Sequence, residues 1–267
     1  MSYLHRKPQQ ADSLGRIQHI TPENANWQYV GFEVVVLAPG ESHCYQTGQQ
    51  ELCAVILSGK ADFISSTLSF KNIGDRTSVF EQKAPYALYL PPGDWLEITA
   101  LTHLEVALCK APAQGELQAR LIQPSDCVSE SRGQGTNHRQ ICNILFGNLP
   151  AERLLITEVI TPAGHWSSYP PHKHDTDALP SESALEETYY HKLNPQQGFA
   201  FQRVYTDDRR IDETICVEHN SVVLVPEGYH PVGAPHGYQL YYLNVMAGPK
   251  RQWVFHNDPQ HEWIIKK

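Results

Sequence analysis

Two histidines one residue apart are the first side chains in this sequence whose spacing could do chemistry. His172 and His174 lie in SSYPPHKHD (167–175), directly after two prolines. Proline disfavours a helix, and in an extended segment residues i and i+2 share a face. The two imidazoles are therefore expected to converge on one point, as metal ligands do. The pair alone is weak evidence, and a solvated loop with two histidines is the alternative.

A carboxylate downstream could supply a third ligand. The run LEETYYHKL (185–193) has the composition of a strand, in which the adjacent Glu186 and Glu187 would face opposite sides. If Glu187 faces inward, Tyr189 and His191 do so as well, and the interior is polar and lined by aromatic rings. We favour Glu187 as the ligand, and Glu186 stays open as the alternative.

The fourth ligand is expected from another strand, in VPEGYHPVGAPHGY (225–238). His230 follows a Pro-x-Gly turn at the end of an apolar run, whereas His236 lies in a loop rich in Gly and Pro, so His230 is favoured. Three imidazoles and one carboxylate suit one divalent transition metal ion: zinc first, with iron, manganese or nickel also suited.

Strands must position these residues, because strand signals dominate the chain. Short β-branched or aromatic runs that end at Gly or Pro occur at 32–40, 52–63, 86–93, 104–109, 154–164, 187–193, 198–208, 221–228 and 238–248. Only 113–122 (AQGELQARLI) is a candidate for a short helix. This spacing predicts an all-β protein, built as a sandwich or a barrel.

The two halves of the chain also resemble each other. YALYLPPGDWLEI (86–98) aligns with SVVLVPEGYHPVG (221–233) at an offset of 135, which pairs Pro91 with Pro226, Gly93 with Gly228, and Trp95 with His230. We therefore predict two domains, 1–125 and 126–267, joined through the polar stretch 124–140. The first has Trp95 in place of the histidine and no His-x-His, and His43 stands alone beside Cys44, so this domain is expected to be free of metal.

Composition limits the partners. The net charge is −8 and no run of Lys or Arg occurs, so neither nucleic acid nor a membrane surface is an expected partner. No apolar run is long enough to span a membrane, and the N-terminus lacks the apolar core of a signal peptide. The six cysteines show no CxxC spacing, which favours reduced thiols and a cytoplasmic location. Gly133 and Gly135 lack the context of a dinucleotide loop, so no nucleotide cofactor is expected.

These motifs resemble those of a known family. HKH, a later Glu and P-x-G-x-H between β runs are similar to the two motifs of the cupin superfamily, and the duplicated halves resemble a bicupin, two tandem jelly-roll β-barrels. Longer blocks resemble the 5-deoxy-glucuronate isomerases of myo-inositol catabolism. They are WQYVGFEVVVLAPGE (27–41), WSSYPPHKHD (166–175), LEETYYHKLNPQQGFAFQRVYTDD (185–208) and VPEGYHPVGAPHGYQLYYLNVMAGP (225–249). The spacing from His174 to Glu187 is longer than in a generic cupin motif, and His236 does not belong to the family pattern.

The resemblance implies an aldose–ketose isomerase that converts 5-deoxy-D-glucuronate, a small uronate, to 2-deoxy-5-keto-D-gluconate. A metal would stabilise the charge that develops on the substrate oxygens, and a base would move a proton between carbons. Glu187, Tyr189, His191 or a metal-activated water could be that base, and a hydride shift is the alternative. Arg203 could bind the substrate carboxylate if it faces inward; an exposed strand charge is the equal alternative.

Two other functions compete on this scaffold. One is a related uronate ketol-isomerase that acts on a ketodeoxyuronate, and the other is a sugar-binding cupin without catalysis. The aromatic tail 250–267 is expected to cover the other half of the chain or a neighbouring subunit of a homo-oligomer.

Overall fold

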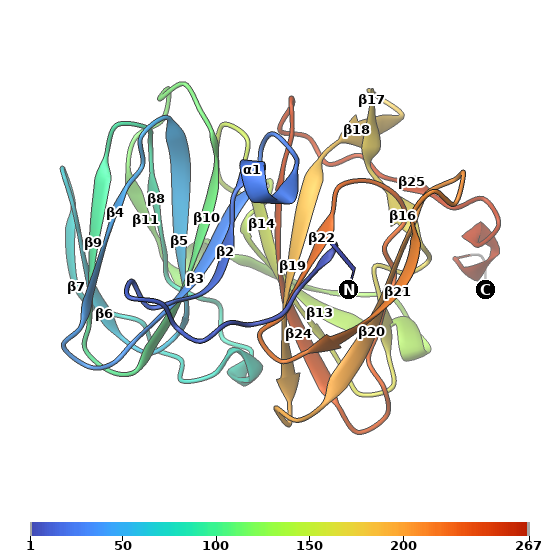
Figure 1. The fold of residues 1–267 in the computed structure, drawn as a ribbon, viewed down its shortest axis with the longest axis horizontal. Helices are drawn as coiled ribbons and strands as arrows, with labels where there is room; N and C mark the ends of the chain where they lie inside the picture. Colours follow the sequence, from blue (N-terminus) through green and yellow to red (C-terminus); the bar gives the residue numbers. More distant parts are fainter. Residues whose placement is uncertain (1, 266–267) are drawn as a thin grey trace. The chain divides into compact units, whose positions relative to one another are not determined.

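The computed structural model describes residues 2–265 and confirms the all-β prediction (Figure 1). The chain forms two compact units. Among the described residues, the N-terminal unit comprises 9–128 and 142–157, and the C-terminal unit comprises 2–8, 129–141 and 158–265. These ranges differ from the predicted 1–125 and 126–267, because the first residues of the chain belong to the later unit and 142–157 belong to the earlier one.

The N-terminal unit contains a six-stranded and a four-stranded antiparallel sheet. The larger has the order β11-β8-β5-β10-β3-β2: β11 (Arg120–Ile122), β8 (Ala87–Leu90), β5 (Gln50–Ser58), β10 (Leu104–Pro112), β3 (Gly31–Leu37) and β2 (Arg16–Ile20). The smaller has the order β4-β9-β6-β7: β4 (Ser42–Gln46), β9 (Trp95–Ala100), β6 (Ala61–Ser65) and β7 (Ser69–Ile73). Alternating residues such as Val35, Ala54 and Leu108 from one sheet and Phe63 and Ile98 from the other form its core.

The C-terminal unit repeats this arrangement with a sheet of the order β1-β22-β19-β24-β14-β13-β12: β1 (His5–Arg6), β22 (Val222–Val225), β19 (Glu186–Asn194), β24 (Gln239–Ala247), β14 (Leu155–Thr161), β13 (Arg139–Leu145) and β12 (Val128–Arg132). Part of β13 and part of β14 fall in the stretch 142–157, and β12 begins at Val128, so these three strands are not wholly within this unit. The facing sheet is β15 (Trp166–Ser167), β23 (Val232–Gly233), β20 (Phe199–Tyr205) and β21 (Asp212–Glu218). Two short pairs complete it: β16 (His172–Lys173) with β25 (His256–Asn257), and β17 (Asp175–Ala178) with β18 (Glu182–Ala184). The dark-blue start of the chain lies beside β22 (Figure 1).

The strand order shows the same duplication as the sequence. β8, β5, β10 and β3 lie next to one another in the first unit, and β22, β19, β24 and β14 do so in the second. β8 begins at Ala87 and β22 at Val222, so these two strands are separated by the predicted offset of 135. The turn that precedes His230 therefore corresponds to the turn before Trp95.

Helices are few and short. They are α1 (Pro22–Ala25) and the 3-10 turns η1 (Val79–Glu81), η2 (Pro124–Asp126), η3 (Gly135–Asn137) and η4 (Glu262–Ile264). The helix predicted at 113–122 is wrong. Gly115 has a φ of +85°, and the backbone N–H groups of Gln114, Gly115 and Glu116 donate to the Glu152 carboxylate instead of to a helix. The stretch 124–140 is likewise more than a linker, because it contains β12 and begins β13.

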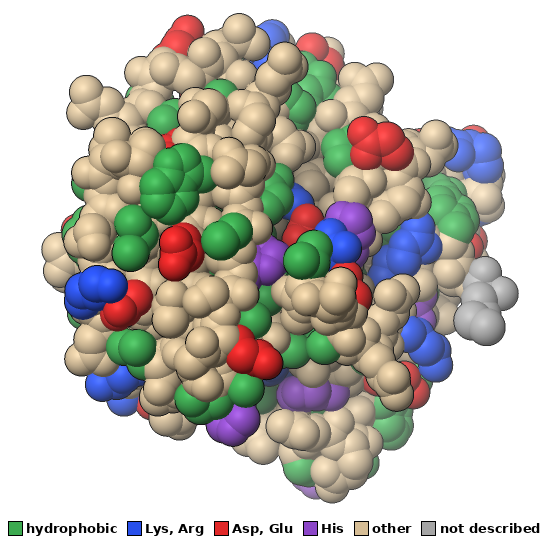
Figure 2. Space-filling model, turned by 60° about the vertical axis from the view of Figure 1, so that its left-hand side comes forward, with side chains coloured by type: hydrophobic (Ala, Val, Ile, Leu, Met, Phe, Trp, Pro, Cys, Tyr) green, Lys and Arg blue, Asp and Glu red, His purple; other side chains and the backbone are tan. Residues whose placement is uncertain are grey.

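None of the helices in residues 2–265 has the length and apolar composition that crossing a bilayer would require. On the face shown in Figure 2, acidic and basic side chains are interspersed with apolar ones.

Candidate metal centre

The His-x-His segment is extended, as its prolines predict. β16 begins at His172 and pairs with β25, so that His172 lies opposite Asn257. Lys173, between the histidines, points the other way and binds Asp175 at 2.8 Å and Asp207 at 3.3 Å. The two imidazoles lie on one face, with ring centroids 6.4 Å apart.

The register of β19 decides which glutamate faces inward. Glu187, Tyr189 and His191 are 2%, 2% and 0% exposed, whereas Glu186 is partly exposed. On the neighbouring β24, Asn244 is opposite Tyr189 and Tyr242 is opposite His191. Two adjacent strands thus line the interior with carboxylate, phenol, imidazole and amide groups.

A tight turn places His230 at this interior. Gly228 has a φ of +89°, and a Cβ atom there would lie 2.5 Å from the Tyr205 carbonyl oxygen, so only glycine fits. The backbone N–H of Gly228 donates to Asp175 at 2.8 Å, which ties the turn to the segment after His174. His230 itself is 1% exposed, whereas His236 is exposed in its loop.

The three inward groups meet at the Glu187 carboxylate. Glu187 Oε2 lies 3.2 Å from His174 Nε2 and 3.3 Å from His230 Nε2. All three atoms are buried and lack a hydrogen-bond partner. Within residues 2–265, no other group of three or more His, Cys, Asp or Glu ligand atoms gathers closely enough to hold a metal ion.

His172 lies beside this group. Its ring centroid is 5.0 Å from that of His230, although its nitrogen is not among the three ligand atoms that lie within 4.8 Å of one another. The structure therefore brings together Glu187, His174 and His230 as predicted ligands, with His172 next to them.

The imidazoles share one hydrogen-bonding arrangement. Each Nδ1 faces a backbone carbonyl: His172 faces Pro170 at 3.4 Å, His174 faces Leu185 at 3.3 Å, and His230 faces Gly228 at 2.8 Å. We assign the ring proton to Nδ1 on this basis, which leaves the Nε2 lone pairs directed at the centre. Lone pairs that face a carboxylate oxygen repel it unless a cation lies between them, so the donor set fits a divalent metal ion.

Burial keeps two of these rings neutral. It lowers the pKa of His172 and of His230 to about 3. Burial also acts to lower the pKa of His174, but the adjacent Glu187 carboxylate more than offsets it, so that this pKa is raised. Neutral imidazoles are the form that binds metal.

A second layer of polar contacts surrounds the centre. Asn244 Nδ2 donates to Glu187 Oε1, the oxygen that faces away from the histidines. The Tyr189 hydroxyl lies 2.9 Å from Ser168 Oγ, and burial raises the pKa of this phenol well above its usual value. His191 Nε2 lies 2.9 Å from Gln202 Oε1, its Nδ1 is buried without a partner, and burial lowers its pKa to about 4.

The C-terminal segment covers the outer side of His172. The Phe255 ring centroid is 4.9 Å from that of His172, and the Trp253 ring is 6.2 Å from it. Asp258 fixes the segment by accepting from the Tyr205 hydroxyl at 2.7 Å. The part of the tail from Trp253 to Asp258 thus packs on its own unit, whereas Trp263 and Ile265 are more than half exposed. Lys266 and Lys267 lie outside the described residues.

Arg203 does not face this centre, which corrects the inward prediction. Alternation along β20 turns Gln202 inward and Arg203 outward. Arg203 forms two 2.8 Å hydrogen bonds with Asp212 on β21, and its guanidinium stacks on the Tyr205 ring at 4.3 Å. Its charge is therefore already paired at the surface. This agrees with the alternative given above, an exposed charge on a strand.

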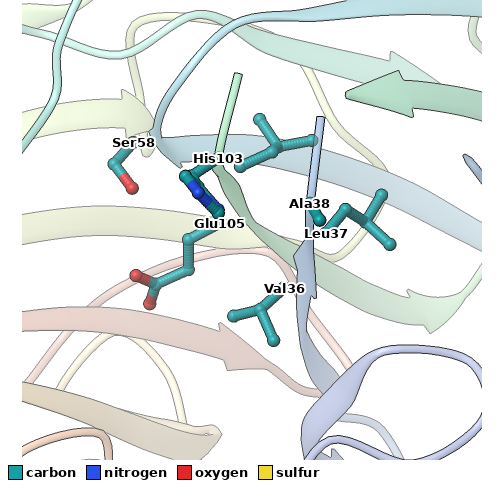
Figure 3. Close-up of a pocket in the computed structure, with 7 residues that line it drawn as sticks. Val36, Leu37, Ala38, Ser58, His103 and Glu105 are labelled. Atoms are coloured by element: carbon teal, nitrogen blue, oxygen red, sulfur yellow. The ribbon is translucent and has the colours of Figure 1, made fainter. Parts of the chain in front are cut away.

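The N-terminal unit has an open hollow of about 340 Å³ (Figure 3). It is lined by Val36, Leu37, Ala38, Ser58, His103, Leu104 and Glu105. Apolar side chains and strand ends make up most of this lining. None of the lining residues belongs to the metal-binding group. In the same unit His43 Nδ1 lies 3.0 Å from the Leu14 carbonyl oxygen.

Known proteins resemble this chain over nearly its whole length. Residues 3–264 match the model of the KduI/IolB family. The chain is 56% identical over 252 residues to a 5-deoxy-glucuronate isomerase of Geobacillus kaustophilus, covering 94% of this chain and 91% of the relative. It is 52% identical over 272 residues to the enzyme of that name from Bacillus licheniformis, and all of both chains is covered.

The chain belongs to the KduI/IolB family. It is an isomerase, as the names of its relatives state. A solved structure of an IolB-like protein from Salmonella typhimurium superposes with a TM-score of 0.95 at 48% identity, over 98% of this chain and 99% of that one.

More distant structures define the fold of this KduI/IolB protein. An oxalate decarboxylase of Lactobacillus farciminis matches with a TM-score of 0.68 at 14% identity, over 100% of this chain and 91% of that one. This likeness concerns the fold alone, and it confirms the predicted bicupin architecture.

Sequence reasoning missed three interior residues of this family member. Asn244 is a lone amide in the apolar run YQLYYLNVMAG, and that isolation was a usable signal. Nothing in the sequence distinguishes Tyr242 from the other tyrosines of the same run. Arg139 lies in the stretch interpreted as a linker, although it is the buried first residue of β13.

Proposed function

We propose that this protein is a metal-dependent aldose–ketose isomerase that converts 5-deoxy-D-glucuronate to 2-deoxy-5-keto-D-gluconate. The observation that carries the proposal is the buried group of His174 Nε2, His230 Nε2 and Glu187 Oε2, three unpartnered ligand atoms within 4.8 Å of one another. The names of relatives at 52–56% identity supply the substrate. No disulfide joins the six cysteines in residues 2–265, which supports action in the cytoplasm.

The ligand set is His172, His174, Glu187 and His230, with zinc the first candidate and iron, manganese or nickel also suited. A bound divalent cation supplies a Lewis acid that stabilises negative charge on the substrate oxygens during isomerisation. The chain's part is to direct the Nε2 atoms of its imidazoles at the centre, through the carbonyls that face each Nδ1.

Glu187, Tyr189 and His191 are the proposed catalytic residues. Tyr189 stays protonated because burial raises its pKa, so it can donate a hydrogen bond but not accept a proton. His191 is neutral, and with its Nε2 proton on Gln202 it keeps a lone pair at Nδ1. Of these two groups His191 is therefore the better proton acceptor. Glu187 serves as a ligand, which leaves it less able to act as a base.

One preparation of the protein tests this function. Elemental analysis of the purified chain is combined with an isomerase assay on 5-deoxy-D-glucuronate, before and after dialysis against a chelator. We expect about one divalent ion per chain, turnover of the substrate, loss of both on chelation, and recovery when the ion is returned. Stoichiometric metal without turnover would favour a sugar-binding cupin, and full turnover by metal-free protein would refute the metal dependence.

A further inference from the structure

A buried arginine without an acidic partner lies in the C-terminal unit. Arg139, the first residue of β13, is 9% exposed. Among the described residues its hydrogen bonding is limited to one contact, from Nη1 to the Asn137 carbonyl at 3.0 Å, and it forms no ion pair. Burial lowers the pKa of this guanidinium, which reflects the cost of holding the charge there.

The strand pattern directs Arg139 to the interior. In β13 the buried residues Arg139 and Ile141 alternate with the partly exposed Gln140, whose side chain accepts from Ser131. Ile141 belongs to the same core cluster as Tyr189 and Tyr242. Because residues i and i+2 of a strand share a face, Arg139 points toward this cluster as well.

The cluster connects Arg139 with the metal centre. The Tyr189 ring lies 5.0 Å from that of Tyr242 and 5.7 Å from that of His230. On the N-terminal side of Arg139, Asn137 Nδ2 donates to the carbonyl of Tyr169 at 3.1 Å, and Tyr169 is three residues before His172. The guanidinium therefore lies on the wall next to the centre, without being one of its ligands.

Such a residue needs an anion. Unpaired buried charges are rare, because the loss of hydration is not compensated. A guanidinium offers five N–H donors in a planar fork that matches a carboxylate, and here one donor is used. A ligand carboxylate would provide the missing counter-charge.

We propose that Arg139 binds the carboxylate of the substrate. This inference rests on the proposed function, since it takes the substrate to be a uronate. In such an acid the carboxylate is at the opposite end of the carbon chain from the aldehyde, so its partner should lie near the metal ligands but not among them. Arg139 has this position. The sequence had suggested Arg203 for the same role.

Two other arginines are poorer candidates. Arg203 is bound to Asp212 by two hydrogen bonds on the outer face of β20. Arg132 is 41% exposed and paired with Glu130 at 2.6 Å. Each of these two arginines therefore already has an acidic partner, and neither is buried.

The test pairs a change in the protein with a change in the ligand. D-glucuronate and its neutral methyl ester are titrated calorimetrically into the metal-containing wild type, Arg139→Gln, Arg139→Lys and the matched control Arg203→Gln. We expect wild type and Arg203→Gln to bind the acid at least about tenfold more tightly than the ester. Arg139→Gln should bind the two equally, and Arg139→Lys should keep only part of the preference because it lacks the fork. An unchanged preference in Arg139→Gln, or no preference in the wild type, would overturn the assignment.

Stability and kinetics separate this role from others. Arg139→Gln removes a buried unpaired charge, so its melting temperature should be no lower than that of the wild type. If the variant nevertheless fails to fold, Arg139→Lys carries the test, and an undiminished preference there refutes the proposal. In the isomerase assay, KM should rise at least about tenfold in Arg139→Gln. A wild type that prefers the acid but turns over no 5-deoxy-D-glucuronate would refute the proposed function and leave the role of Arg139 standing.

Discussion

The Glu187 Oε2 atom lies 3.2 Å from His174 Nε2, and both atoms are buried without a hydrogen-bond partner. With the proton of the neutral ring assigned to Nδ1, which faces the Leu185 carbonyl, the contact joins a lone pair to a carboxylate oxygen. In the absence of a cation this arrangement is unfavourable, and with one it becomes two bonds of a coordination shell.

Glu187→Gln should remove metal, and Glu186→Gln should not. Both changes keep the size of the side chain and remove its charge, but only Glu187 is directed at the histidines. We expect the affinity for zinc in Glu187→Gln to fall by more than the 10–100-fold that loss of an outer partner costs. Competition with a chromophoric chelator measures this affinity.

In the absence of metal, Glu187→Gln should be at least as stable as the wild type, although it binds metal more weakly. An amide at position 187 can donate a hydrogen bond to an imidazole lone pair, which a carboxylate cannot do. Metal-free Glu187→Gln should therefore melt at or above the temperature of the metal-free wild type. A clearly lower melting temperature would mean that Glu187 stabilises the fold for another reason.

His230→Ala should abolish bound metal and activity, whereas His236→Ala should retain both. His230 is buried with its Nε2 at the centre, and His236 is exposed in a loop. Elemental analysis gives the occupancy, and circular dichroism checks that the β fold is kept. Stoichiometric metal in His230→Ala together with its loss in His236→Ala would reverse our choice of ligand.

Asn244→Ala should weaken the site without removing a ligand. Its amide donates to Glu187 Oε1 and so fixes the orientation of the carboxylate. Losing such an outer partner typically costs 10–100-fold in metal affinity, and we expect a loss in that range. Gln239→Ala at the start of the same strand is the control, since its side chain is only partly buried and lies at the strand end. Equal affinities in the two variants would argue against the orienting role.

Much of the fold was predictable because strands carry their own signals. β19 (Glu186–Asn194) extends one residue beyond each end of the predicted run 187–193. β22 (Val222–Val225) lies inside the predicted run 221–228. Prolines before His172 and the Pro-x-Gly turn before His230 also restrict the backbone locally. These local restraints were sufficient to bring Glu187, His174 and His230 together.

The sequence-based predictions failed where tertiary contacts, or the direction in which a strand residue faces, determine the structure. The segment 113–122 has a helical composition, but the Glu152 carboxylate, distant in sequence, captures its N–H groups. Arg203 and Gln202 are neighbours on β20, and the choice of which faces inward depends on pairing that one sequence does not specify. Arg139 lay in a polar stretch, and only the structure reveals that its side chain is buried.

Gly228→Ala should destabilise the protein more than Gly237→Ala. Both glycines have a φ near +90°, so each change costs about 1–2 kcal/mol for a left-handed alanine. Only at Gly228 would the new Cβ meet backbone, at 2.5 Å from the Tyr205 carbonyl oxygen, which should add about 1–3 kcal/mol. Urea unfolding measures the difference. Because the Gly228 carbonyl also accepts from His230 Nδ1, this variant should lose metal more readily than Gly237→Ala. Equal losses of stability and metal in the two variants would show that the turn tolerates a side chain and that the position of His230 does not depend on it.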